Sequence, residues 1–394
     1  MSKGGRRLKI GLVFDDSLDR PDGVQQYVFG VGAWLAGQGH EVHYLVGETS
    51  RTDVPHVHSL ARNIGVRFNG NRLTIPLPAD TNDIRQLLED ESFDVLHVMM
   101  PYSPMMAQKV IRCVPESTVV VGTFHILPQN WLVQWSTSLL GVWLGKSLRR
   151  FDKVFAVSSS AARFAESAFK VQDVEVLPNV VNLAHFKGVS PLAKYARDDH
   201  TLTIMFLGRL VPRKGCIDLL KAARDIRQMP GASEMSFRVV ICGKGPQEAD
   251  LKQAAEDFGL SDIVEFAGFI SEADKPHYLA AADVMVFPST GGESFGIVLI
   301  EAMASGRPVV LAASNPGYVT VMEPQPQQMF KPGDFKGLAQ LLYGYMNKPF
   351  SRQKAAEWQR TYVEQFDVDV VGERLQTEYE QLVASRHKRL RKQA

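Results

Sequence analysis

Two carboxylates, Glu293 and Glu301, lie eight residues apart in a glycine-rich segment that follows a short apolar run at residues 284–287. The pattern predicts a helix over residues 294–304, whose first amides lack an acceptor within the helix and attract an anion. These amides belong to Phe295, Gly296, Ile297 and Val298. A separation of roughly 10–12 Å along the helix axis matches a sugar–diphosphate–ribose chain, so one carboxylate can bind sugar hydroxyls and the other ribose hydroxyls. The alternative is a helix with two acidic residues and no ligand.

Two cations follow another strand. A strand predicted over residues 202–207 leads into Gly208 and Arg209, and Lys214 comes five residues later. Arginine offers a planar fork of donors and lysine a point charge, so together they can neutralise a departing diphosphate. The alternative is that these are ordinary loop charges, and we expect Arg213 to be one of those, in contact with solvent.

Gly243 and Gly245 follow a strand predicted over residues 237–242. Their lack of a side chain permits close approach of a ligand to the backbone. As a dinucleotide-binding fingerprint the segment is weak, because Glu248 occupies the third glycine position.

The N-terminal half offers fewer chemical groups. Gly23 begins a helix predicted over residues 24–38 and can face a phosphate there. His125 follows a strand predicted over residues 118–123 and is either a catalytic or a structural histidine. His56 and His58 are separated by one residue, but no third ligand is evident, so the sequence predicts no metal site.

Short apolar runs alternate with helical patterns in both halves, which is typical of parallel sheets covered on both faces. The predicted elements of the first half cover residues 8–14, 24–38, 41–46, 94–99, 118–123, 131–150, 153–157, 161–169 and 174–177. Those of the second half cover residues 202–207, 217–228, 237–242, 247–258, 263–267, 275–281, 284–287, 294–304 and 308–312. Residues 179–200 contain prolines and a polar run and are predicted to be a linker. We therefore expect an α/β protein with two facing, doubly wound domains and a ligand in the cleft between them.

The composition excludes several classes of protein. The 394 residues include 44 basic and 43 acidic side chains, giving a net charge of +1, which argues against a dedicated nucleic-acid binder. Three scattered cysteines indicate a reducing cytosol. The apolar run at residues 10–14 is too short for a signal peptide, and residues 126–145 are too polar for a membrane span. We expect a cytoplasmic protein.

Five basic residues lie between Arg386 and Lys392, in a C-terminal segment that is predicted to be helical. They are either a solvated helix end, where cations suit the helix dipole, or a contact with anionic lipid headgroups. In the second case the protein is peripheral at the inner face of the membrane.

Together these segments resemble the retaining glycosyltransferases of family 4, which have the GT-B fold of two Rossmann-like domains. The resemblance covers nearly the whole chain and rests on the Glu293–Glu301 block, the segment from Gly208 to Gly215, Gly243-Lys-Gly, Gly23 and the Thr-Phe-His sequence that ends at His125. Residues 291–306, 21–25 and 157–158 are most like those of phosphatidylinositol mannosyltransferases. Two positions differ from that subgroup: Asp22 replaces the first of a glycine pair, and Asp16 replaces an aromatic residue.

The resemblance implies domains at residues 1–178 and 201–367, with a helix at 368–394 packing back on the first. It also implies roles for the matching residues. Arg209 and Lys214 would bind the donor diphosphate, and Glu301 the ribose. Glu293 and the amides of Phe295, Gly296, Ile297 and Val298 would hold the transferred sugar. Ile270 would lie at the base, His125 near the anomeric carbon, and Gly23 near the diphosphate, with Gly208, Gly243 and Gly245 completing the donor site.

The implied function is transfer of a mannose- or glucose-type sugar from a GDP- or UDP-sugar to a lipid or glycan acceptor. The anomeric configuration would be retained, by front-face attack in which the leaving phosphate takes the acceptor's proton. No tightly bound cofactor is expected; a divalent cation is compatible, although no ligand motif is present. Two alternatives are a catalytically silent nucleotide-sugar-binding protein and a nucleotide-sugar epimerase of the same fold.

Overall fold

The computed structural model describes residues 6–19, 22–68, 71–76, 79–125, 144–145, 147–195, 201–231 and 236–393. The chain forms two compact units. The first comprises Met1–Val180 together with Val368–Ala394, and the second Val181–Asp367. Most of the helix predicted over residues 131–150 lies outside the described residues.

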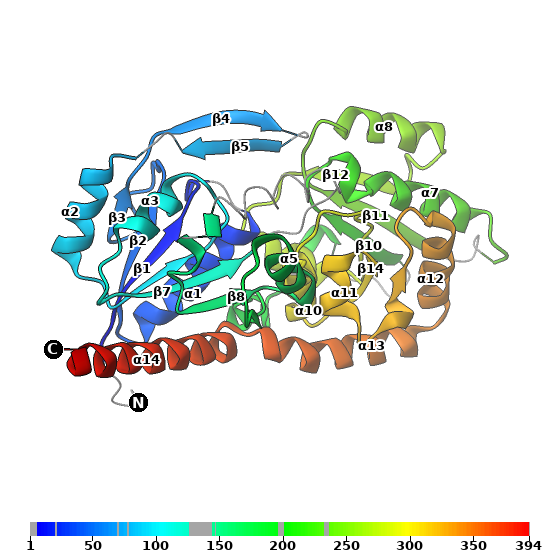
Figure 1. Ribbon diagram of the computed structural model, residues 1–394. Coiled ribbons are helices and arrows are strands. Elements are labelled where there is room, and N and C mark those ends of the chain that lie inside the picture. The colour runs from blue at the N-terminus through cyan, green and yellow to red at the C-terminus, as the bar shows by residue number, and fades with distance from the viewer. Residues whose placement is uncertain are drawn as a thin grey trace. The chain divides into compact units, whose positions relative to one another are not determined.

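Runs of aliphatic residues build a parallel sheet in the first unit, in the order β3-β2-β1-β6-β7-β8-β9 (Figure 1). The strands are β1 (Lys9–Phe14), β2 (Glu41–Val46), β3 (Val57–Ser59), β6 (Val95–Val98), β7 (Val119–Phe124), β8 (Lys153–Ala156) and β9 (Glu175–Val176). A separate antiparallel hairpin joins β4 (Asn63–Phe68) and β5 (Asn71–Pro76). The chain winds from β1 to one side through β2 and to the other through β6. The topological switch point, where ligands of such sheets bind, is therefore between β1 and β6.

Helices cover both faces of this sheet. Side chains of α1 (Gly23–Gly37) and α14 (Val368–Gln393) share one core, and those of α2 (Thr81–Glu91) and α3 (Met106–Cys113) share another. The chain also forms α5 (Ser159–Phe169).

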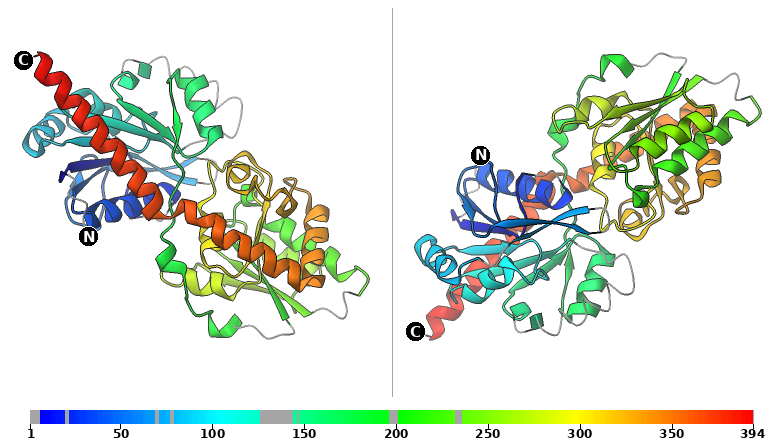
Figure 2. Two further views of the ribbon diagram at one scale, coloured as in Figure 1. Left: turned by 90° about the horizontal axis from the view of Figure 1, so that it is seen from below. Right: turned by 90° about the horizontal axis from the view of Figure 1, so that it is seen from above.

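The C-terminal helix α14 belongs to the first unit and lies along α1 (Figure 2). The indole N–H of Trp34 donates to Asp369 at 2.7 Å. The buried ring of His97 lies with Nδ1 2.6 Å from the Tyr379 hydroxyl and Nε2 2.7 Å from Thr123 Oγ1. Polar contacts as well as apolar packing therefore fix α14 to the sheet.

The second unit has a parallel sheet in the order β12-β11-β10-β13-β14-β15. Its strands are β10 (Thr201–Leu207), β11 (Ser236–Cys242), β12 (Val264–Gly268), β13 (Val284–Phe287), β14 (Val309–Ala313) and β15 (Met329–Phe330). Its helices are α6 (Leu183–Phe186), α7 (Cys216–Arg227), α8 (Glu248–Asp257), α9 (Lys275–Ala281), α10 (Ile297–Ala304), α11 (Pro316–Met322), α12 (Phe335–Asn347) and α13 (Pro349–Tyr362). Here the switch point is between β10 and β13.

The doubly wound α/β architecture predicted from the sequence is confirmed. The predicted bounds of β2, α9 and β13 are those of the structure. The sequence analysis missed the strands β3 to β5 and β15 and the helices α2, α3, α6, α11 and α12, and α6 lies in the stretch predicted to be a linker. Among the described residues, no helix has both the length and the apolar character of a membrane span.

Candidate active site

A partly buried cluster of charged side chains surrounds the carboxylate of Glu293 in the second unit. Oε1 of Glu293 lies 2.7 Å from Nη1 of Arg213 and 2.8 Å from Nζ of Lys214, and it accepts a hydrogen bond of 2.9 Å from Ser289 Oγ. Arg213 and Lys214 belong to a 3₁₀ turn, Pro212–Lys214, that follows β10, and Ser289 and Glu293 follow β13. The cluster therefore lies at the switch point of this sheet, where a ligand is expected.

The cluster carries excess positive charge. Burial lowers the pKa of Lys214, and the neighbouring Arg213 and Arg209 lower it further, while Glu293 opposes the shift. Burial raises the pKa of Glu293, but Lys214 and Arg213 outweigh burial and hold it below its usual value. Two cations, Arg213 and Lys214, thus share the ionised carboxylate of Glu293, and an anionic ligand such as a diphosphate can balance the remaining charge.

The prediction that Arg213 is a solvated loop charge is wrong. Its guanidinium pairs with Glu293, and its side chain is 23% exposed. The side chain of Lys214 is 13% exposed, so both cations are largely shielded from solvent. A buried carboxylate requires paired cations because an isolated charge is costly to desolvate.

The helix predicted to begin at residue 294 begins instead at Ile297. Gly296 has φ of +105°, and a Cβ built there would lie 2.6 Å from the ring of Tyr318. This left-handed residue caps the N-terminus of α10, and the amide of Leu299 donates to its carbonyl. The unsatisfied amides of the first turn are therefore those of Ile297 and Val298. The side chain of Phe295 is buried, 5.7 Å from the ring of Phe366.

Glu301 lies inside α10 and forms its own ion pair. Its Oε1 is 2.7 Å from Nζ of Lys275, which also lies 2.6 Å from Glu272. Burial raises the pKa of Glu301, and the ammonium of Lys275 opposes that shift. Because Glu293 is not on the helix, the predicted axial spacing of the two carboxylates does not apply. The structure gives each carboxylate separate cationic partners.

Sequence reasoning missed three residues around Glu293 and Glu301. Ser289 donates to Glu293, Lys275 pairs with Glu301, and Asn315 Nδ2 donates to the carbonyl of Ser289 at 3.0 Å. Lys275 lies in α9 and Asn315 follows β14, so these two contacts join segments that are far apart in the sequence.

The glycines of the second unit hold two loops together. A Cβ built on Gly243, where φ is +143°, would lie 1.9 Å from the carbonyl oxygen of Gly208, and one on Gly245 would lie 2.3 Å from that of Leu210. The amide of Gly208 donates in turn to Cys242. Ile270 is buried two residues after β12. The loops after β10 and β11 can therefore pack backbone against backbone only with glycine at these positions.

His125 directly follows β7 in the first unit, at the carboxyl edge of the sheet. The imidazole is buried and lies edge-on to Tyr27 with ring centroids 5.0 Å apart. Burial lowers its pKa to about 3, so the ring is neutral at pH 7. Among the described residues its Nε2 has no hydrogen-bond partner.

Gly23 is the first residue of α1, as the sequence analysis expected within one residue. Asp22 caps this helix, and its carboxylate accepts hydrogen bonds of 2.9 Å from the amides of Val24 and Gln25. The negative charge that a helix N-terminus attracts is therefore supplied in part by Asp22 itself.

Asp15 follows β1 at the switch point of the first sheet. Its Oδ1 accepts a hydrogen bond of 2.6 Å from the amide of Ala107 in α3. Burial raises its pKa to about 6, although this hydrogen bond and one from Ser103 oppose the shift.

We expect Asp15→Asn to remove part of the pH dependence of stability. The folded-state pKa is above the unfolded value, so the folded state keeps its proton and wild-type stability falls as the pH rises from about 4 to about 6. Relative to wild type, the free energy of unfolding of the variant should increase by roughly 2–3 kcal/mol between pH 4 and pH 7. Native-state hydrogen exchange of β1 and β6 at both pH values measures this gain. If the variant and wild type differ in stability by the same amount at pH 4 and at pH 7, the raised pKa of Asp15 is wrong.

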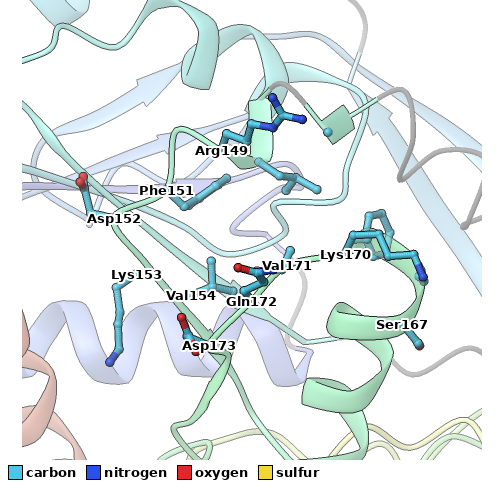
Figure 3. A pocket seen from close by; sticks show the side chains of 14 residues that line it. Arg149, Phe151, Asp152, Lys153, Val154, Ser167, Lys170, Val171, Gln172 and Asp173 are labelled. Atoms are coloured by element: carbon cyan, nitrogen blue, oxygen red, sulfur yellow. The ribbon is translucent and has the colours of Figure 1, made fainter.

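A pocket of about 840 Å³ lies elsewhere in the first unit (Figure 3). It is lined by the first residues of β8, the end of α5 and the following loop, with Arg149 and Lys170 among the side chains around it. These residues lie at the amino ends of the strands, away from the edge that carries His125. The pocket is therefore separate from the candidate active site.

Two doubly wound units, with cation–carboxylate pairs at the switch point of the second and a buried, neutral histidine at the strand edge of the first, define a GT-B glycosyltransferase. Residues 21–185 match the model for Glycosyltransferase Family 4, and residues 192–361 match that for Glycosyl transferases group 1. The chain belongs to family 4 of the glycosyltransferases.

Comparison with individual proteins agrees with this assignment. The chain is 31% identical over 384 residues to the phosphatidyl-myo-inositol mannosyltransferase of Mycobacterium leprae, which covers 96% of this chain and 98% of that protein. It is 30% identical over 331 residues to the GDP-mannose-dependent alpha-(1-6)-phosphatidylinositol monomannoside mannosyltransferase of Mycobacterium tuberculosis. That alignment covers 79% of this chain and 82% of that protein. The fold is similar to that of sucrose-phosphate synthase from Thermosynechococcus elongatus, with a TM-score of 0.74 and 21% sequence identity. The superposition covers 96% of this chain and 100% of that one. The protein is thus a hexosyltransferase that moves a sugar from a nucleotide diphosphate sugar to a lipid or glycan acceptor.

Proposed function

We propose that this chain transfers mannose from GDP-mannose to a phosphatidylinositol-type lipid with retention of configuration. The observation that carries the reaction type is the pairing of both Arg213 and Lys214 with Glu293, which provides net positive charge for a diphosphate. The names of the relatives at about 30% identity support the donor and the acceptor.

In this proposal Arg209 and Lys214 bind the diphosphate. Their charge stabilises the leaving group as the bond between the anomeric carbon and the phosphate oxygen breaks. The acceptor hydroxyl attacks from the same face, and its proton passes to the departing phosphate oxygen. Because the phosphate serves as the base, the neutral ring of His125 takes no proton and acts as a hydrogen-bonding contact for the sugar.

Other residues orient the donor. Glu293 and the first amides of α10 bind hydroxyls of the transferred sugar, and Glu301, held by Lys275, binds the ribose. Ile270 contacts the base, and Gly23 approaches the diphosphate. Gly208, Gly243 and Gly245 shape the loops around the donor. Donor binding requires no metal ion in this proposal.

A donor screen followed by a transfer assay tests the function. We expect GDP-mannose to raise the melting temperature more than UDP-glucose or ADP-glucose, because a ligand that binds the folded state stabilises it. Labelled mannose should then appear in phosphatidylinositol vesicles. Stabilisation without transfer to any lipid or glycan indicates a silent binding protein, and conversion of the donor alone indicates an epimerase.

We also propose that the exposed end of α14 holds the protein at an anionic membrane surface. Arg386 is not part of this contact, because its guanidinium pairs with Asp152 and its side chain is 11% exposed. Lys388, Arg389, Arg391 and Lys392 are exposed. This arrangement leaves a cationic strip that anionic headgroups attract.

The same vesicles test this contact. Each cation near an anionic surface contributes about 1 kcal/mol, so replacing Lys388, Arg391 and Lys392 with Gln should weaken co-sedimentation by about 100-fold. Glutamine at the exposed Lys331, Lys336 and Lys354 of the second unit is the matched control. Equal binding of both variants to phosphatidylinositol vesicles, or binding unaffected by salt, rules the contact out.

A further inference from the structure

Three side chains from separate segments of the first unit converge at one edge of its sheet. His43 lies in the middle of β2, His58 lies on the edge strand β3, and Glu91 is the last residue of α2 (Figure 1). Nδ1 of His43 is 2.9 Å from Nε2 of His58 and 3.9 Å from Oε2 of Glu91. One ligand atom from each residue lies within 4.8 Å of the others. The third ligand that the sequence did not reveal for His58 is therefore present in the fold.

The neighbours of His43 orient its ring as a metal ligand. Its other nitrogen, Nε2, lies 3.1 Å from Oε1 of Glu41. A carboxylate in this position accepts the Nε2 proton and leaves the lone pair of Nδ1 directed at His58 and Glu91. The same carboxylate–histidine arrangement orients histidines that bind metals in other proteins. Phe93 packs edge-on against the His43 ring and limits its rotation.

The distances suit a small divalent ion. Zinc binds nitrogen and carboxylate oxygen at about 2.0–2.2 Å, so ligands of a tetrahedral site lie about 3.3 Å apart. The observed separations of 2.9 and 3.9 Å lie on either side of this value.

Lys9 is the competing cation in this cluster. Its Nζ lies 2.8 Å from Oε2 of Glu91 and 3.1 Å from Oε1 of Glu41. An ion bound to Glu91 displaces the ammonium toward Glu41, which remains within reach. A metal-free cluster, held together by Lys9 and by a hydrogen bond between the rings of His43 and His58, is the alternative that an experiment must exclude.

We propose that His43, His58 and Glu91 bind a zinc-type divalent ion, with water as the fourth ligand. The ion ties the edge strand β3 and the end of α2 to the sheet. Its ligands come from β2, β3 and α2, none of which carries a residue assigned to sugar transfer, so it has a structural role that is independent of that reaction.

Titration of metal-free protein with Zn²⁺ and with Co²⁺ tests the site. The full chain, stripped with a chelator, should bind one equivalent of Zn²⁺, show visible d–d bands of tetrahedral Co²⁺, and melt at a higher temperature with either ion. His58→Asn and Glu91→Gln should each weaken Zn²⁺ binding by at least about 100-fold. Lys9→Met should strengthen it, because the competing ammonium is gone.

Two matched variants serve as controls. Glu89→Gln removes an exposed carboxylate from the same helix, and His277→Asn removes an exposed histidine from the second unit. Both should bind Zn²⁺ like wild type. Failure of wild type to bind, or equal affinity in His58→Asn, Glu91→Gln and wild type, overturns the proposal. Neither result affects the transfer assay, so the two proposals can fail separately.

Discussion

Replacing Lys214 with Ala should lower kcat/KM for sugar transfer by about 1000-fold, or about 4 kcal/mol of transition-state stabilisation. The ammonium is held against Glu293 beside Arg213, at the switch point of the second sheet. Charge on the leaving diphosphate grows in the transition state, so the loss should fall mainly on kcat. Initial rates with a labelled donor measure it.

Two further variants make this expectation specific. Glu301→Ala should also reduce transfer strongly, but through the KM for the donor, if this carboxylate binds ribose in both ground and transition states. Lys252→Ala removes an exposed lysine from α8 in the same unit and should retain wild-type rates. Wild-type turnover in both Lys214→Ala and Glu301→Ala, with folding intact, refutes the assigned roles.

Gly243→Ala should destabilise the second unit by roughly 3 kcal/mol. The new Cβ would lie 1.9 Å from the carbonyl oxygen of Gly208, and φ of +143° is strained for any residue with a side chain. The clash is with backbone, which cannot rotate away as a side chain can. Native-state hydrogen exchange of the β10 and β11 amides reports the free energy of opening of this unit.

Gly259→Ala separates steric clash from backbone strain. Gly259 has φ of +67°, and a Cβ built there meets nothing within 4 Å. This substitution should therefore cost only the left-handed conformation, about 1–2 kcal/mol. A loss as large as that of Gly243→Ala would show that the contact with Gly208 is not the cause.

Much of the fold follows from local patterns. Continuous apolar runs such as Val284–Phe287 predict buried parallel strands because both of their faces are covered. The alternation with helices then requires a doubly wound sheet, and the carboxyl ends of the strands carry the charged residues. Helix α2 was missed, since it buries few residues, Ile84 and Leu88 among them.

The site was less predictable because its contacts are long-range. Arg213 and Lys214 are adjacent in the sequence, and nothing local shows that both reach Glu293, eighty positions away. The start of α10 depended on the left-handed Gly296, where a side chain would clash with the ring of Tyr318. The partners of His43 appear only when β2 and β3 pair in parallel, with Leu45 opposite His58.

The path of α14 affects how the chain folds during its synthesis. Leu375 and Tyr379 complete the core beside α1, yet they are translated only after the whole second unit. At about 5–20 residues per second, the ribosome needs roughly 10–40 s to make that unit. During this interval the nascent first unit exposes an apolar groove, and His97 lacks the hydroxyl of Tyr379. The second unit is contiguous in sequence and has no such delay, so it can reach its native state before the segment that precedes it.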